Sequence, residues 1–163
     1  MIQFNKSPGQ RILELGGGNN PQSFSDVRVD IRQGPHTNFT ADFEKPLPIK
    51  DQDFDAVFAQ FVIEHLSWRT VRQFIKEMYR VVKPGGKVVI VTANTEAQFE
   101  YIKEHPDGWA VHQGDPFSAF SCVLFGDLDY PENGHKNYQS PKLAVELFSE
   151  AGFEGITVQP FGD

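Results

Sequence analysis

Residues 11–31 (RILELGGGNNPQSFSDVRVDI) place three consecutive glycines directly after a short apolar run. Only about eleven residues, with Pro21 among them, separate that run from the next one at 27–31. A crossover helix between parallel strands needs about a dozen residues or more. The sequence therefore predicts two adjacent strands joined by a glycine-rich loop, with room for at most a single helical turn.

Short apolar runs continue along the chain and alternate with segments of helical periodicity. In the first helical segment Ser67 is a candidate N-cap, and in the second one Pro141 and Gly152 fit the first turn and the end. This alternation is typical of a single α/β domain, here residues 1–163, with a mainly parallel sheet. The expected strands cover residues 11–15, 27–31, 37–41, 54–59, 87–92 and 153–160, and the expected helices cover residues 67–82 and 141–151.

The segment 95–140 lies between the fifth expected strand and the last helix. It contains eight aromatic residues and three of the five histidines, and turn-forming residues interrupt it at several points. Long loops in compact domains commonly serve as lids or binding loops. We therefore expect an aromatic-rich lid or substrate segment, and irregular packing over the sheet face is the alternative.

Composition limits the functions that this chain can have. The formal net charge of −7 repels phosphodiesters and acidic lipid surfaces, which argues against a nucleic-acid partner. Cys122 is the single cysteine, so a disulfide framework is excluded and a reducing compartment fits. No apolar run approaches the roughly 20 residues that span a membrane, and the first ten residues lack the pattern of a signal peptide. A cytoplasmic protein is the expectation.

Acidic residues and glycines follow three of the expected strands, at the ends where open α/β sheets bind their ligands. Glu14, Asp30 and Asp42 lie there, together with the glycines 16–18. A dinucleotide fits poorly, because a phosphate charge roughly 4 Å from Glu14 would be repelled by about 4 kcal/mol at an effective dielectric constant of about 20. Pro21 also replaces the third glycine of GxGxxG, and no Gly-Lys-Ser/Thr follows for a triphosphate.

A ligand with a positive charge and no phosphate suits this pattern better. S-Adenosylmethionine carries a sulfonium, an ammonium, a ribose diol and an adenine. Glu14 suits the cationic end, Asp30 can accept hydrogen bonds from both ribose hydroxyls, and Asp42 can accept one from the adenine amino group. Three alternatives stay open. Glu14 could instead cap the backbone of the turn, and Asp30 and Asp42 could be plain turn residues. Phe43 could stack on adenine or belong to the core.

Several spaced motifs resemble those of the class I S-adenosylmethionine-dependent methyltransferases, mainly between residues 11 and 92. The segments that carry the resemblance are ELGGG (14–18), VD (29–30), AD (41–42), PLPIKDQDFDAV (46–57), EHL (64–66) and YRVVKPGGKVVIVT (79–92). Within the class, the short first loop and HKNYQSPKLAVELFSEAGF (135–153) look most like small predicted methyltransferases. The resemblance implies S-adenosylmethionine as cofactor, S-adenosylhomocysteine as product, and a Rossmann-like three-layer sandwich with a mainly parallel sheet.

The resemblance also implies a set of cofactor-binding residues at the strand ends. Gly17 stands where family members usually have Cys, Ser or Ala, a replacement that we expect to be harmless. The implied set comprises Glu14, Gly16, Gly17, Gly18, Asp30, Ile31, Asp42, Phe43, Gln60 and Phe61.

The chain departs from the family in two ways that make the expected fold a truncated one. The helix after the glycine loop is almost missing, because the first crossover is short. No sequence is left for the family's seventh strand after the expected sixth, so an edge of the sheet would be exposed. Natural proteins usually cover or pair such edges, which makes a homodimer a hypothesis.

Histidines are the candidate catalytic residues, because an imidazole can take a proton from a hydroxyl or an amine near neutral pH. His65 follows Glu64 in the EHL segment, and His112 and His135 lie in the segment 95–140. The resemblance places EHL at a helix entry in members with differing substrates. A structural hydrogen-bonding role for His65 is therefore the alternative.

No metal site is expected from the spacing of the potential ligands, which matches no known site. Cys122 is expected to be a small core residue. The residues considered as ligands are His105, His112, His135, Asp127 and Asp129.

These features together predict methyl transfer from S-adenosylmethionine to a hydroxyl or amine of a small-molecule acceptor. One alternative is a non-catalytic S-adenosylmethionine-binding partner or regulatory protein, because no unmistakable base is present. A nucleic-acid methyltransferase is a second alternative. It is disfavoured because the chain has neither Asp/Asn-Pro-Pro-Tyr/Phe, the signature of amino-methylating enzymes for DNA bases, nor a Pro-Cys nucleophile motif.

Overall fold

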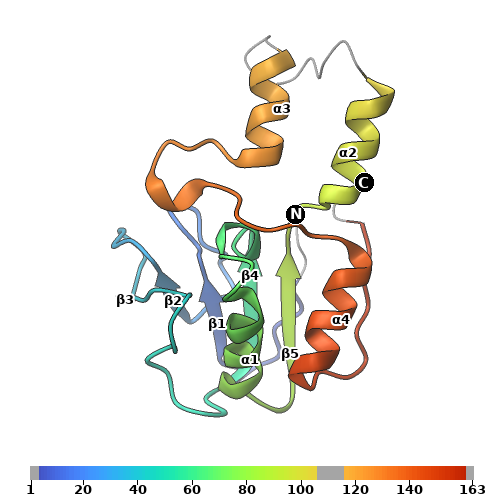
Figure 1. Ribbon diagram of the computed structural model, residues 1–163. Coiled ribbons are helices and arrows are strands. Elements are labelled where there is room, and N and C mark those ends of the chain that lie inside the picture. The colour runs from blue at the N-terminus through green and yellow to red at the C-terminus, as the bar shows by residue number, and fades with distance from the viewer. Residues whose placement is uncertain (1–3, 106–115, 161–163) are drawn as a thin grey trace.

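The computed structural model describes residues 4–105 and 116–160 (Figure 1). At its centre is a sheet of five parallel strands in the order β3-β2-β1-β4-β5. The predicted α/β fold with a parallel, Rossmann-like sheet is thereby confirmed. The strands are β1 (Ile12–Leu15), β2 (Val27–Asp30), β3 (Phe39–Thr40), β4 (Phe54–Gln60) and β5 (Val82–Val91).

The helices surround the carboxyl ends of the strands and one face of the sheet. No helix within the described ranges is both long and apolar enough to cross a membrane. Helices α2 and α3 lie inside the segment 95–140, which the sequence predicted as a lid or substrate segment and for which no helix was expected. The helices are η1 (Ile63–His65), α1 (Val71–Val81), α2 (Thr95–Glu104), α3 (Pro116–Phe125), η2 (Pro131–Asn133) and α4 (Pro141–Ala151), where η denotes a 3₁₀ helix.

Helix α4 has the bounds that the sequence predicts, whereas α1 begins later. Gly152 ends α4 with a φ of +102°, in the left-handed region that favours glycine. The prediction that Ser67 caps α1 is wrong, because α1 begins only at Val71, and the Ser67 hydroxyl instead accepts a hydrogen bond from the backbone N–H of Arg69 ahead of the helix. The N-cap is Thr70, which makes no capping hydrogen bond with its side chain.

The predicted strand at 153–160 is not formed, because the chain turns back on α4 before it reaches the sheet. The backbone N–H of Phe153 donates to the carbonyl oxygen of Phe148 at 3.1 Å, and Gly155 has a φ of +62°. Strand β5 therefore lies at an edge of the sheet. The homodimer inferred from such an edge stays a prediction.

The two faces of the sheet are covered differently. Alternate side chains, including Leu13 and Val57, join α1 in the main apolar core, and α4 packs beside α1 on that face (Figure 1). Phe58 is equally buried but points to the opposite face, where Phe24 meets it edge-on with a centroid distance of 5.3 Å. Phe4 stacks on Phe24 in turn. Within the described residues, the face of the sheet opposite α1 is therefore covered here by a loop, which takes the place of the third layer of the sandwich.

A buried ion pair fixes the segment that leads into β4. The Glu77 carboxylate lies 2.7 Å from a guanidinium nitrogen of Arg80 and accepts a hydrogen bond from the backbone N–H of Leu47. Arg80 also donates to the carbonyl oxygens of Leu47 and Ile49. The Arg80 guanidinium and the Leu47 N–H hold the pKa of Glu77 below its usual value.

Replacing Glu77 by Gln should lower the free energy of unfolding by about 1.5–3 kcal/mol near neutral pH, because charge-assisted hydrogen bonds are lost. A carboxylate with a lowered pKa in the folded state stabilises the fold above its unfolded-state pKa. That stabilisation disappears as the pH falls through the folded-state pKa, so the difference between wild type and Glu77→Gln should shrink in acid. Urea unfolding over a pH series measures both effects.

Arg72→Gln is the matched control for this prediction. Arg72 pairs with Glu150 at 3.0 Å, but both side chains are more than half exposed. An exposed pair is expected to contribute less than about 1 kcal/mol. Equal losses in Glu77→Gln and Arg72→Gln would contradict the role assigned to the buried pair.

Candidate functional site

The glycine loop lies at the carboxyl ends of β1 and β2, where the sequence predicts a ligand crevice. Gly16 has a φ of +76°, and a Cβ atom built on it would lie 2.3 Å from a methyl group of Val62. Gly18 has a φ of +55°, but nothing lies within 4 Å of its Cβ position. The first glycine is thus required by packing, whereas the last one presents bare backbone to open space.

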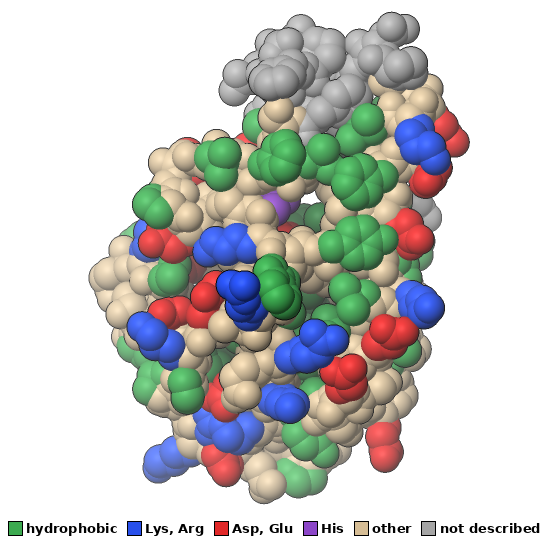
Figure 2. All heavy atoms as spheres, viewed as in Figure 1, with side chains coloured by type: hydrophobic (Ala, Val, Ile, Leu, Met, Phe, Trp, Pro, Cys, Tyr) green, Lys and Arg blue, Asp and Glu red, His purple; other side chains and the backbone are tan. Residues whose placement is uncertain are grey.

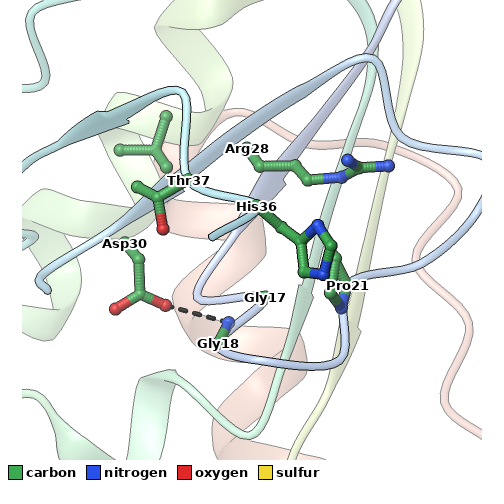
Figure 3. A pocket seen from close by; sticks show the side chains of 8 residues that line it. Gly17, Gly18, Pro21, Arg28, Asp30, His36 and Thr37 are labelled. Carbon is green, nitrogen blue, oxygen red and sulfur yellow. Dashed lines mark hydrogen bonds between the residues drawn. The ribbon is translucent and has the colours of Figure 1, made fainter. Parts of the chain in front are cut away.

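Asp30 connects this loop to the end of β2. One carboxylate oxygen accepts a hydrogen bond from the backbone N–H of Gly18 at 3.0 Å (Figure 3). The other accepts from the backbone N–H of Arg32 at 3.0 Å. Since an ionised carboxylate has about four acceptor positions, Asp30 retains capacity for ligand hydroxyls. The structure therefore brings Gly18 and Asp30 together as the sequence predicts.

The Glu14 carboxylate turns into the loop and does not open onto the crevice. It is 3% exposed, accepts hydrogen bonds from the backbone N–H of Gln22 and from the Ser25 hydroxyl, and lies 3.9 Å from Nε of Arg28. This is the capping role that the sequence left as an alternative. Direct contact between Glu14 and a cationic ligand is thus disfavoured, and Arg28, which sequence reasoning missed, offsets part of its charge.

Asp42 and Phe43 make the contacts expected from the alternatives to cofactor binding, which were a turn residue for Asp42 and a core residue for Phe43. Asp42 pairs with Lys45 at 2.9 Å and accepts from the backbone N–H of Glu44. The Lys45 ammonium and the Glu44 N–H hold the pKa of Asp42 below its usual value, although burial opposes the shift. Phe43 is buried and stacks on Phe74 with a centroid distance of 5.4 Å. The Phe43 ring packs in the core beneath Gly16, and its stacking on adenine stays a prediction.

Phe61 directly follows β4 in an unusual backbone conformation. Its φ is +53°, which is rare for a bulky residue, and its side chain is 48% exposed. Strained residues of this kind cluster at functional sites, so the observation points to a ligand-facing role. Its neighbour Gln60 accepts a weak hydrogen bond from Gln22 at 3.4 Å. Ile31, at the end of β2, is 39% exposed.

Residues 126–139, which we call the strap, cross the carboxyl ends of the strands between α3 and α4 (Figure 1). Near β2, the Arg32 guanidinium lies 3.5 Å from the ring centroid of Tyr130. Beyond β4, the Asn137 side chain donates to the carbonyl oxygens of Ile63 and Leu66 at 2.6 and 2.7 Å. The strap is therefore attached at both ends of the crevice. The lid role of 95–140 itself stays a prediction.

The strap brings His135 to His65, with ring centroids 5.0 Å apart. Burial lowers the pKa of His65, the nearby Glu64 raises it, and His135 lowers it. Figure 2 shows a histidine in a hollow of the surface with hydrophobic side chains around it. His112 lies outside the described residues.

Of the other residues considered as metal ligands, the described ones, His105, Asp127 and Asp129, make contacts away from His135. His105 ends α2, where its ring stacks on Tyr101 with centroids 4.0 Å apart. Asp129 accepts a hydrogen bond from the Asn133 side chain, and Asp127 raises the pKa of the Cys122 thiol by a hydrogen bond. His112 lies outside the described residues, so the absence of a metal site among these five residues stays a prediction. Sequence reasoning missed a different group of potential metal ligands, formed by Glu64, His65 and His135. Glu64 and His65 are neighbours in the sequence, but His135 reaches them only through the strap.

The hollow beside the glycine loop is small. It holds about 160 Å³ of space open to solvent, less than the roughly 300–1,000 Å³ of typical ligand pockets. Gly18 and Asp30 line one side, and His36 and Thr37 line the other (Figure 3). A nucleoside ligand would therefore need additional space, toward Phe61 and the strap.

The comparisons with known proteins agree on one family. Residues 20–90 match the family described as methyltransferase domain. A demethylmenaquinone methyltransferase of Renibacterium salmoninarum is 31% identical over 51% of this chain and 41% of its own length. That of Beutenbergia cavernae is 31% identical over 91% of this chain and 68% of its own length. The chain thus spans between about two fifths and two thirds of these relatives.

The solved structures support the same fold. An S-adenosylmethionine-dependent methyltransferase from Mesorhizobium loti superposes with a TM-score of 0.62 at 17% identity, over 94% of this chain and 78% of that one. The strand order and the glycine loop define the Rossmann-like class of nucleoside-binding folds. The chain belongs to the class I S-adenosylmethionine-dependent methyltransferases. The cofactor of that family is S-adenosylmethionine.

Replacing Gly16 by Ala should destabilise the fold more than replacing Gly18 by Ala. Both changes force a residue with a Cβ atom into a left-handed conformation, at a cost of about 1–2 kcal/mol. Gly16→Ala adds a clash with Val62 worth about 1–3 kcal/mol. Urea unfolding of the two variants measures the difference.

A double-mutant cycle with Val62→Ala tests the cause of that difference. The smaller side chain should relieve part of the loss in Gly16→Ala and none of the loss in Gly18→Ala. Additive losses for Gly16→Ala and Val62→Ala would contradict the packing argument.

Proposed function

We propose that this protein transfers the methyl group of S-adenosylmethionine to an oxygen or nitrogen of a small aromatic acceptor of the quinol type. The observation that carries the proposal is the hydrogen bond from the backbone N–H of Gly18 to the Asp30 carboxylate, next to a Cβ position of Gly18 that nothing else approaches within 4 Å. The relatives in the family are named demethylmenaquinone methyltransferases, which supports an acceptor of the quinone class.

The cofactor end of the site would use groups that are already oriented. Asp30 is held by Gly18 and Arg32, so its remaining acceptor positions suit a ribose diol. Gly18 allows close approach because its Cβ position is open. S-Adenosylmethionine, when bound, supplies a methyl carbon activated by a sulfonium. The other residues in the proposed set are Glu14, Gly16, Gly17, Ile31, Asp42, Phe43, Gln60 and Phe61, of which Glu14, Gly16 and Phe43 would act by shaping the loop.

The acceptor end would be formed by Phe61 and the strap. Apolar side chains at this end of the sheet are partly exposed, including Phe99 at 45% and Leu128 at 64%. Such a surface suits a flat apolar ring and excludes water from the reacting atoms. The chain's main task is to hold the acceptor atom about 3–3.5 Å from the methyl carbon and in line with it.

His65 and His135 are the proposed groups nearest the acceptor, and His112 remains a prediction outside the described residues. Methyl transfer forms the bond from the acceptor atom to carbon as the bond from carbon to sulfur breaks, and the acceptor proton leaves to solvent or to an imidazole. A base is useful but not required, because the sulfonium already activates the carbon. These histidines would therefore orient the acceptor as much as take its proton.

Asp30→Ala should weaken binding of S-adenosylhomocysteine by about ten- to a hundredfold, as expected when a ligand loses hydrogen bonds worth about 1.5–3 kcal/mol to a charged acceptor. Isothermal titration calorimetry measures the change. Asp53→Ala is the matched control, because Asp53 pairs with Arg11 at the amino end of β4. Equal affinity in both variants would mean that the cofactor lies elsewhere.

Activity is tested by mass spectrometry after incubation with S-adenosylmethionine and a panel of hydroquinones, phenols and aromatic amines. A product heavier by one methyl group is expected for at least one ring hydroxyl or amine. Cofactor binding without product over the whole panel would favour the non-catalytic binding protein. Failure to bind either form of the cofactor would overturn both readings of the site.

A further inference from the structure

Three potential metal ligands meet just beyond β4. Glu64 and His65 lie on η1, and His135 lies on the strap. One ligand atom from each side chain lies within 4.8 Å of the other two. The backbone fixes this arrangement, because the N–H of Lys136 donates to the carbonyl oxygen of Glu64 at 2.8 Å. The group thus depends on two segments that are about 70 residues apart in the sequence.

The Glu64 carboxylate is buried without a strong cationic partner. It is 3% exposed and accepts a hydrogen bond from the Thr92 hydroxyl at 3.0 Å. Within the described residues, no lysine or arginine nitrogen lies within 4.0 Å of it, and the nearby Lys136 side chain reaches toward Glu44 instead. Burying a carboxylate costs several kcal/mol unless a positive charge compensates it. A cation between Glu64 and the two imidazoles would supply that compensating charge.

We propose that Glu64, His65 and His135 bind a divalent first-row transition-metal ion, with Zn²⁺ as the representative case. Two imidazoles and one carboxylate are a ligand set that such ions accept, with open positions for water or substrate. An ion at the centre of three atoms spaced by 4.8 Å lies at most about 2.8 Å from each. Bonds of about 2.0–2.2 Å then require side-chain shifts of less than about 1 Å.

Neighbouring groups orient two of the three ligands. Nδ1 of His65 lies 3.4 Å from the carbonyl oxygen of Gly134, so the tautomer with hydrogen on Nδ1 leaves Nε2 as the ligand atom. Thr92 holds one oxygen of Glu64. Metal sites commonly use such contacts to fix ring orientation and ligand basicity. Gly134 lies on the strap, and Thr92 directly follows β5.

The ion would lie at the proposed acceptor end of the site, and its role there rests on the proposed function. The metal would lie beside Phe61, at the end of the sheet where the acceptor is proposed to bind. An acceptor oxygen would fill an open coordination position, which favours ring hydroxyls over amines as the acceptor class. Metal binding by itself does not depend on methyl transfer, so the two can be tested separately.

The test uses the full chain after treatment with a chelator. Titration with Co²⁺, followed by visible absorption, and with Zn²⁺, followed by calorimetry, should give one ion per chain. His135→Asn should weaken binding at least tenfold and remove the Co²⁺ absorption bands. His105→Asn is the matched control, because His105 stacks on Tyr101 away from this group, and its affinity should equal that of wild type.

Two further measurements keep a failed experiment interpretable. Circular dichroism and S-adenosylhomocysteine binding show whether His135→Asn is folded, and Glu64→Gln should weaken metal binding in the same way. Saturable binding that is equal in wild type, His135→Asn and His105→Asn would overturn the site, as would no saturable binding in folded wild type. Metal binding without cofactor binding would instead leave this site standing and overturn the proposed methyl transfer.

Discussion

The buried carboxylate of Glu14 is the contact on which the remainder of the site depends. It accepts hydrogen bonds from Gln22 and Ser25 and so holds a loop in the place of a crossover helix. That loop presents Gly18 to Asp30 at the carboxyl end of the sheet. It also carries Phe24 onto Phe58, which closes the face of the sheet opposite α1. One side chain thereby fixes both the glycine loop at the edge of the sheet and part of the core.

Local sequence signals predicted those parts of the fold that short-range interactions determine. The helix at 141–151 has the predicted bounds because its proline start and glycine end act within one turn. Five of the six predicted strands appear near their predicted positions because apolar runs flanked by turn residues are unambiguous. The strand at 153–160 failed because a strand needs a neighbour, and the chain instead turns back through Phe153 onto α4.

The candidate site was predictable in its residues but not in their orientations. The spacing of acids and glycines predicted that Gly18 and Asp30 meet at one edge of the sheet, yet it could not show that Glu14 turns inward or that Phe43 enters the core. The approach of His135 to His65 was also hidden, because it depends on Asn137 and Lys136 attaching the strap to η1. Contacts over such separations leave no periodic signal in the chain.

The short connection between β1 and β2 also affects how the chain folds. Leu13 pairs with Val27 across a separation of 14 residues, whereas its partner on the other side, Val57, is 44 residues away. Closing the smaller loop costs about 1 kcal/mol less chain entropy. The β1–β2 ribbon is therefore the contact expected to form early during folding, with β4 and its helix joining afterwards. The glycine loop would then be assembled before the domain that surrounds it.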